Sequence, residues 1–216
     1  MSKIEVDTID TVTGTTTLQV GSTNVSTINL GASGDTINIP SGATITNSGT
    51  ATGFGKVGQV QSTFYNTPTS QSVGGNTDTS ITGINVAITP SSTSSKILLF
   101  ARFFGEGDST FYWNAMYFFR RGTTKIGSGV ASGNRLVGAT THTLNFYDSD
   151  QTSTPDPMAP LFHLDSPNTT SEITYHLGIN APDASYTLYI NRTVGDANTI
   201  AYDRGSCEIT AMEILP

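Results

Sequence analysis

Isolated pairs of aliphatic residues recur along the first 52 residues, within a background of threonine, serine, glycine and asparagine. Members of a pair are two positions apart, and successive pairs are ten and then nine positions apart, which is the pattern of short strands in a repeating β-structure. One short strand of this kind, from a single chain, has too few apolar side chains to form a hydrophobic core. Several copies of the segment wound around each other would have enough. We therefore expect a β-stalk, as an intertwined β-prism or a β-helix. Its expected core consists of Leu18, Val20, Ile28, Leu30, Ile37, Ile39 and Ile45.

Longer hydrophobic runs with aromatic residues begin after residue 56 and predict a globular, all-β head. Apolar and polar residues alternate over 173–179, and clusters of glycine, proline and asparagine separate the runs. So many short runs with turn-forming residues between them favour a β-sandwich, and within that class a jelly roll. The expected strands are 57–65, 80–88, 96–104, 111–120, 142–147, 158–164, 172–179, 185–193 and 206–214.

The composition changes between these two regions and predicts three parts: an attachment and stalk region (1–52), a glycine-rich joint (53–58) and a head (59–216). The joint, GFGKVG, matches the dinucleotide-binding pattern literally. That site needs a helix directly after the glycines, and a strand pattern follows instead. The polar composition of 1–52 leaves a disordered segment as the alternative, against which the regular spacing of its aliphatic pairs argues.

Charged residues are scarce, at 12% of the chain, and the net charge is −7. The only adjacent basic pair is Arg120-Arg121. Nucleic-acid binding requires a basic patch, so we expect no nucleic-acid partner. No run approaches the roughly 18 apolar residues of a membrane span, and the first residues do not have the pattern of a secretory signal. We expect no membrane insertion.

The motifs of common enzymes and metal sites are missing from the sequence. There is no G-x-S-x-G elbow, and the three histidines are far apart. The acidic segments 106–108 and 148–150 fall short of a full calcium-binding loop. The single cysteine, Cys207, lies in a strand pattern, and we expect it to be a buried, inert thiol. We therefore predict no catalytic residue, no metal site, no cofactor and no enzymatic activity.

Two aromatic segments next to acidic and polar residues are candidates for receptor binding. An exposed ring can stack on a sugar while neighbouring polar groups bind its hydroxyls. The alternative for the tryptophan is a place in the core or in a subunit interface, and for the aspartates plain solvation in a loop. The candidate residues are Tyr112, Trp113, Tyr147, Asp148 and Asp150.

Several phrases of the sequence resemble fibre-like structural proteins of tailed bacteriophages from marine hosts. They lie near both ends and in the middle of the chain: 3–9 (KIEVDTI), 34–45 (GDTINIPSGATI), 88–90 (ITP) followed by 94–99 (SSKILL), 186–192 (YTLYINR) and 209–214 (ITAMEI). The resemblance implies a virion protein of the tail-fibre or head-fibre kind, with a homotrimeric assembly. It also implies an N-terminal part attached to other virion proteins and a C-terminal head that faces the host surface.

Two functional hypotheses follow. In the first, the protein is a trimeric fibre of the virion whose head binds a glycan or protein of the host cell surface, and three weak sites on one fibre gain strength through avidity. In the second, it is a purely structural decoration or adaptor fibre whose head binds another virion protein. We favour the first hypothesis.

Overall fold

A computed structural model describes residues 20, 26–46, 56–108, 114–143, 153, 155, 160–182 and 185–216. The chain divides into two compact units, Met1–Thr52 and Gly53–Pro216. The described residues contain twelve β-strands, all in the second unit, and no helix. All strand pairings are antiparallel. The expectation of an all-β protein is confirmed for this part of the chain.

The described residues of the N-terminal unit form two β-turns that are eight residues apart. Asp35 N donates to Ala32 O at 3.0 Å, and Ala43 N donates to Pro40 O at 3.1 Å. The third residue of each turn is a glycine with a positive φ, +95° at Gly34 and +86° at Gly42, a conformation that glycine adopts without steric cost. The sequence repeats with the same period, since S-G-x-T-I occurs at 33–37 and again at 41–45.

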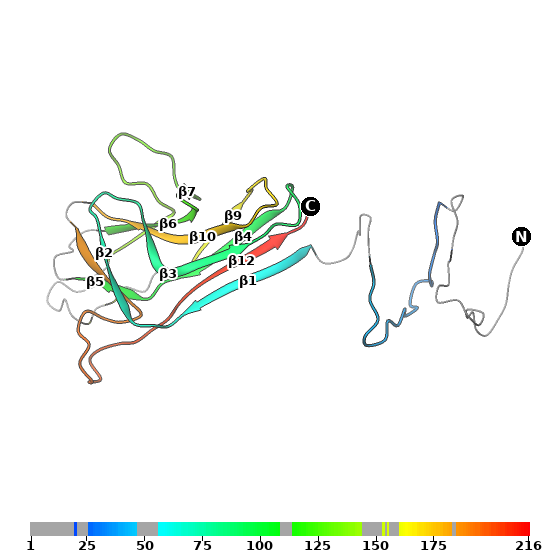
Figure 1. Ribbon diagram of the computed structural model, residues 1–216, viewed down its shortest axis with the longest axis horizontal. Helices are drawn as coiled ribbons and strands as arrows, with labels where there is room; N and C mark the ends of the chain where they lie inside the picture. Colours follow the sequence, from blue (N-terminus) through cyan, green and yellow to red (C-terminus); the bar gives the residue numbers. More distant parts are fainter. Residues whose placement is uncertain are drawn as a thin grey trace, which may run out of the picture. The chain divides into compact units, whose positions relative to one another are not determined.

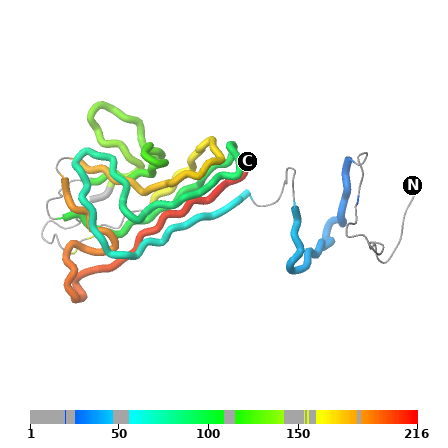
Figure 2. The backbone as a smooth tube through the Cα atoms, viewed as in Figure 1, coloured from blue at the N-terminus to red at the C-terminus, as the bar shows by residue number. Residues whose placement is uncertain are grey.

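The first sheet of the head joins the first and last strands of the domain (Figure 1). Its strand order is β1-β12-β4-β9. β1 and β12 run side by side along their whole length (Figure 2), and Leu215 N donates to Lys56 O at 2.7 Å beyond the end of the ladder. Entry and exit of the chain therefore lie together. The strands are β1 Val57–Tyr65, β12 Cys207–Ile214, β4 Lys96–Arg102 and β9 Leu161–Asp165.

The second sheet has the order β3-β10-β6-β7, and β8 also pairs with β6. A smaller third sheet has the order β2-β11-β5. The strands of the second sheet are β3 Thr79–Ile88, β10 Ile173–Asn180, β6 Asn114–Arg121, β7 Thr124–Ile126 and β8 Thr140–Thr143. Those of the third are β2 Thr69–Val73, β11 Tyr186–Ile190 and β5 Gly105–Gly107.

One hydrophobic core lies between the sheets and takes side chains from all three. The strands contribute alternate residues, as the two-residue period of a strand requires. On β12, for example, Cys207, Ile209 and Ala211 are fully buried while the residues between them are partly exposed. The prediction of a buried Cys207 is confirmed, and burial raises the pKa of its thiol to about 11.

The expected strands agree with the structure in part. β1 has the predicted bounds, whereas the strand expected over 96–104 ends at Arg102 and that over 185–193 is limited to Tyr186–Ile190. β8 covers Thr140–Thr143, and 144–147 lie outside the described residues. The strands β2, β5 and β7 were not expected. Since β1 begins at Val57, the last two residues of the expected joint belong to this strand.

Candidate functional site

A polar pocket of about 680 Å³ opens beside the second sheet of the head. Its described walls come from the chain just before β3, from β7 with the segment after it, and from the end of β10. Most of the side chains around it carry hydrogen-bonding groups, as a site for a polar ligand requires. Those side chains are Asn76, Thr77, Asp78, Lys125, Ser128, Arg135 and Asn180.

One oxygen of Asp78 holds two neighbouring side chains in place. Asn180 Nδ2 donates to Asp78 Oδ1 at 2.6 Å, and Lys125 Nζ lies 2.8 Å from the same oxygen. Lys125 Nζ also donates to Val137 O at 2.7 Å and lies 4.1 Å from the centroid of the Phe118 ring. A carboxylate, a carbonyl and an aromatic face therefore surround the ammonium group and fix it at the pocket wall.

Two polar atoms of the wall have no hydrogen-bond partner within the described part of the chain, namely Asn180 Oδ1 and Ser128 Oγ. Asn180 is only 5% exposed, and its amide orientation is set because the nitrogen donates to Asp78. A buried acceptor without a partner costs free energy. Both atoms are almost fully covered by the protein, so a ligand in the pocket would meet the exposed polar side chains of its wall instead, such as Asn76 and Arg135. Groups of this kind suit a polar ligand better than an apolar molecule.

The pocket does not supply a pair of carboxylates for glycoside cleavage. Asp78 is the only acidic residue among the described residues that line it, and Asn180 and Lys125 occupy its oxygen. Hydrolysis of a glycosidic bond by the usual route needs two carboxyl groups on either side of the bond.

The five receptor-binding candidates lie outside the described residues, in the segments 109–113 and 144–150. The structure nevertheless describes the strands that bear these segments. β6 begins at Asn114, directly after the first segment, and β8 ends at Thr143, directly before the second. Asn114 and Thr143 are partners in the antiparallel register, so the two segments leave the second sheet from adjacent points.

The polar pocket lies at the same end of the second sheet. Asn180 is the partner of Met116 on β6, two positions from Asn114, which corresponds to roughly 7 Å along a strand. Gly138, at the end of the segment that forms one pocket wall, packs directly on Met116. Sequence reasoning missed this pocket, because its residues come from three separate stretches of the chain and no local motif joins them.

The acidic segment 106–108 is not the solvated loop that the sequence suggested. Glu106 lies in β5 and is fully buried, and its Oε2 accepts a 2.7 Å hydrogen bond from Val194 N. Asp108 Oδ2 accepts a 2.7 Å bond from Thr187 N on β11. Both carboxylates therefore hold backbone amides.

Metal ligands and membrane spans were also sought in the described residues. No three His, Cys, Asp or Glu side chains among them gather as a metal site would require. Nor does any helix in this part of the chain have the length and apolar character needed to cross a membrane.

The aliphatic residues of the expected stalk are solvent-exposed in the single chain. Six of the seven are described, with exposed fractions between 46% and 66%, and Leu18 lies outside the described residues. The structure assigns no strand to 26–46, so the strand pairing expected there is not formed within one chain. The six are Val20, Ile28, Leu30, Ile37, Ile39 and Ile45.

Comparison with known proteins gives little further guidance. No protein-family model matches the sequence, and no curated protein matches it. Among solved structures, the chain is similar to the tripod (BppUct-A-L) from the baseplate of bacteriophage Tuc2009, at 14% sequence identity and a TM-score of 0.20. The match covers 84% of this chain and 84% of that chain. A TM-score this low means that the two backbones differ largely.

Proposed function

We propose that this protein is a fibre-like structural protein of a tailed-bacteriophage virion, whose head binds a hydroxyl-rich ligand of the host cell surface. The observation that carries the proposal is the arrangement at one end of the second sheet. A polar pocket with exposed hydrogen-bonding side chains lies there. The paired residues Asn114 and Thr143, next to which the segments 109–113 and 144–150 join the sheet in sequence, lie at the same end.

The chemistry of this end of the sheet favours a saccharide. Tyr112, Trp113 and Tyr147 bring rings on which a sugar can stack, and Asp148 and Asp150 bring acceptors for its hydroxyls. The pocket contributes amide, hydroxyl and charged groups at the same end of the sheet. The role is one of binding and not of catalysis, in keeping with a pocket whose described carboxylate is already hydrogen-bonded.

The topology of the head supports a jelly roll. Two antiparallel sheets with the orders β1-β12-β4-β9 and β3-β10-β6-β7 enclose one core, and the first strand pairs with the last. Such a domain presents its loops at the ends of the sandwich, on a rigid scaffold, which is where binding residues are commonly found.

The N-terminal part, in this proposal, forms a homotrimeric stalk and attaches the head to other virion proteins. The exposed aliphatic residues and the two repeated glycine turns support an assembly of several chains, because a single chain leaves these side chains in water. The phrases at 3–9 and 34–45, which resemble phage fibres, lie in this part. Three heads on one stalk would bind a repetitive surface glycan through avidity.

Binding of the full-length protein to arrayed surface polysaccharides of marine bacteria tests the proposal. We expect saturable binding that the double variant Asp148→Ala/Asp150→Ala weakens at least about tenfold, the effect of roughly 1.4 kcal/mol. Arg135→Ala removes an exposed charged side chain of the pocket wall and should weaken binding as well. Thr82→Ala, an exposed position on β3, is the control.

Binding to purified phage particles without any binding to polysaccharides or cells would instead favour the decoration or adaptor fibre. Full binding by both pocket-side variants would remove this end of the sheet from the site.

A further inference from the structure

The outer faces of the two large sheets differ in character. On the second sheet, the outward residues Asn85, His176 and Arg120 form one polar row across β3, β10 and β6. Antiparallel sheets commonly present such a polar face to water. The first sheet does not follow this rule. Its outward residues are mostly apolar: Val57, Val60, Phe64, Leu98, Phe100, Phe162, Leu164, Met212 and Ile214.

These apolar residues form continuous rows across the first sheet. Phe100 is the direct partner of Phe162, and Leu98 is the direct partner of Leu164. The second of these rows continues through Met212 to Val60. The buried residues between them, such as Leu99 on β4, point to the core. The two rows therefore form one patch on the outer surface of this sheet, which we call the apolar face, and Phe64 lies on the same surface beyond a polar strip.

The apolar face leaves a large apolar area uncovered in the single chain. Phe64, Phe100 and Phe162 are 58%, 42% and 73% exposed. With roughly 200 Å² for a phenylalanine side chain, the three rings alone leave on the order of 350 Å² uncovered. The aliphatic neighbours extend the patch beyond the few hundred Å² usual for soluble monomers and towards the roughly 800 Å² that each partner buries in a standard protein interface.

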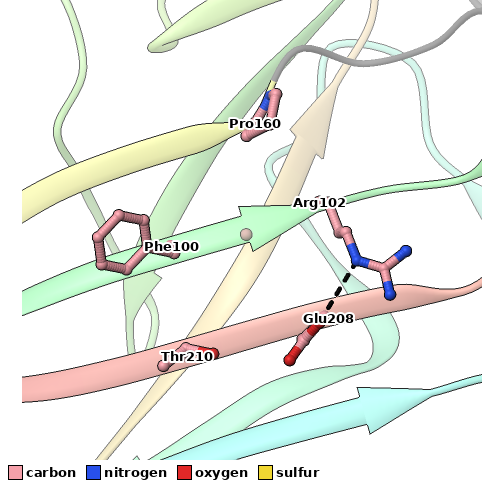
Figure 3. Close-up of a pocket in the computed structure, with 6 residues that line it drawn as sticks. Phe100, Arg102, Pro160, Glu208 and Thr210 are labelled. Carbon is pink, nitrogen blue, oxygen red and sulfur yellow. Dashed lines mark hydrogen bonds and ion pairs between the residues drawn. The ribbon is translucent and has the colours of Figure 1, made fainter.

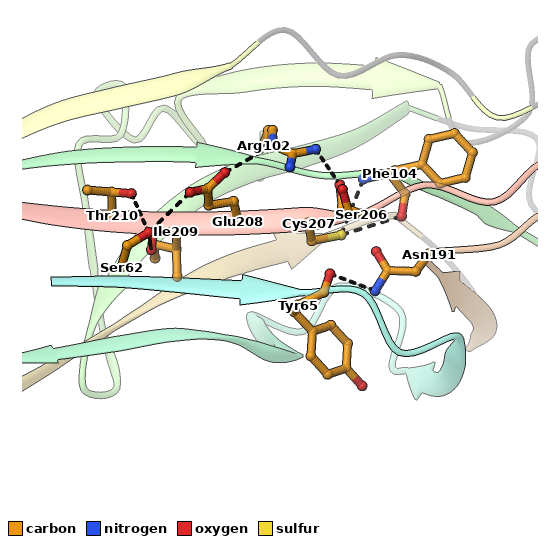
Figure 4. Close-up of polar contacts among 10 residues, drawn as sticks. All are labelled: Ser62, Tyr65, Arg102, Phe104, Asn191, Ser206, Cys207, Glu208, Ile209 and Thr210. Carbon is orange, nitrogen blue, oxygen red and sulfur yellow. Dashed lines mark hydrogen bonds and ion pairs between the residues drawn. The ribbon is translucent and has the colours of Figure 1, made fainter.

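The charged pair at the middle of the apolar face is compensated within the chain, and Lys96 at its edge adds one exposed positive charge. Arg102 Nε lies 3.4 Å from Glu208 Oε2, and Arg102 Nη1 donates to Ser206 O at 2.8 Å. Ser62 Oγ connects Glu208 to Thr210 on the same face, as the dashed contacts of Figure 4 show. The chain carries a net charge of −7, so most of its surface repels a second copy, whereas this face presents no uncompensated carboxylate.

A shallow pocket of about 220 Å³ interrupts the apolar face (Figure 3). It lies between Phe100, Pro160 and the Arg102–Glu208 pair, with Thr210 at its floor. The most exposed ring of the face, Phe162, is the strand partner of Phe100 and protrudes next to it. When two copies of this face meet, a projecting ring of one copy can fill the pocket of the other, which gives the shape complementarity of a specific interface.

We propose that the apolar face of the first sheet is the surface through which the heads bind one another, so that its occupant is a second copy of this chain. This inference rests on the homo-oligomer of the proposed function and identifies the surface that holds the heads together. It also places the ligand-binding end of the second sheet on the opposite side of the sandwich, where it stays accessible in the assembly.

Site-specific labelling of the full-length protein tests the proposal. Ser62→Cys puts a thiol on the apolar face, and Ala87→Cys puts one on the outer face of the second sheet; both native residues are exposed. Cys207 is fully buried, with its thiol pKa raised to about 11, and reacts slowly. Maleimide labelling is measured together with the native mass by light scattering.

We expect an oligomer in which the thiol of Ser62→Cys reacts at least about tenfold more slowly than that of Ala87→Cys, because an interface core excludes reagent and water. Adding Phe162→Glu to Ser62→Cys should restore fast labelling without lowering the thermal stability of the head. Dilution to monomers should restore it too.

Three results would overturn the proposal in different ways. Equal labelling rates in an oligomer would mean that the N-terminal unit alone holds the chains together, and the trimer of the proposed function would stand. A monomeric full-length protein would overturn both the shared face and the trimer. Protection that persists in a monomer would mean that a part of the same chain covers the face. None of these results alters the polysaccharide-binding test.

Discussion

The hydroxyl of Tyr175 on β10 donates a 2.7 Å hydrogen bond to Asp165 Oδ2 on β9. The two strands belong to different sheets, so this bond joins the halves of the head at the edge of the core. Arg121 Nη1 lies 3.1 Å from the same oxygen. Burial, and next the Asp165 carboxylate, raise the pKa of Tyr175 above its ordinary value, so the tyrosine remains a donor over the usual pH range.

Loss of this carboxylate should therefore destabilise the head. Asp165→Ala leaves a buried hydroxyl and a guanidinium without their acceptor, and we expect it to lower the free energy of unfolding by about 3 kcal/mol. Tyr175→Phe removes one bond and should cost about 1.5 kcal/mol. Urea unfolding of both variants and of the double variant measures the coupling. Strict additivity would show that the two residues do not act together.

The lowered pKa of the Glu213 carboxyl group predicts that the folded head loses stability in acid. It is 1% exposed. Burial opposes its ionisation, but contacts with Ser95, Gln59 and Ser91 outweigh this effect and lower its pKa from 4.5 to about 2. The unfolded chain then binds the proton more readily, so the stabilisation is fully present above pH 4.5 and is lost as the pH falls towards 2.

The Glu213→Gln variant isolates this contribution from those of other carboxylates. We expect it to be less stable than the wild type at pH 7, and we expect the difference in unfolding free energy to shrink as the pH falls from 4.5 to 2. Thermal or urea unfolding across this range measures the difference. A difference that stays constant with pH would contradict the assigned pKa.

Gly105 should tolerate no side chain. A Cβ atom at this position would collide with the backbone carbonyl of Tyr189 and with the Phe103 ring, and the carbonyl cannot move without breaking the pairing of β5 with β11. We expect Gly105→Ala to lower the free energy of unfolding by about 1–3 kcal/mol. The matched control is Gly129→Ala, where the nearest atom is 3.9 Å away. Equal effects of the two substitutions would refute the steric explanation.

The aliphatic residues of the N-terminal unit should contribute to stability only when several chains assemble into a stalk. Ile28 and Leu30 are 47% and 66% exposed in one chain, so replacing both with aspartate removes no contact of the monomer. In a trimeric stalk the same change would bury like charges, and we expect it to reduce the native mass or to unwind the stalk while the circular dichroism of the head is unchanged. An unaltered trimer with unaltered melting would disprove the role of these pairs.

The sequence predicts the strands in which apolar and polar side chains alternate clearly. It does not predict the strands that form only because their backbone pairs with a neighbouring strand. β1 has its predicted bounds, and β10 lies within one residue of the expected 172–179. β2 reads TSQSV and β5 reads GEG. Neither contains an alternating apolar pattern, and both become strands because β11 lies between them and binds them through its backbone.

The run over 98–101 shows how one pattern leaves two readings open. From the sequence it is a strand buried on both sides or one in a subunit interface. In the structure, Leu99 and Ala101 lie in the core, whereas Phe100 is exposed on the other side, so within the single chain this strand is buried on one side only. The polar pocket gave no sequence signal, because Asp78, Lys125 and Asn180 meet only after the second sheet has formed.

The pairing of β1 with β12 has a mechanical consequence. Force that enters the head at Lys56 and acts along β1 loads the whole ladder from Val57 to Tyr65 in shear. Backbone hydrogen bonds between two strands that are loaded in shear must break together. When the strands are instead pulled apart from one end, the hydrogen bonds break one pair after another. Because β4 holds β12 from its other side, the load spreads into the sheet. A pull on the N-terminal end of the head in this direction therefore meets the resistance of the whole ladder.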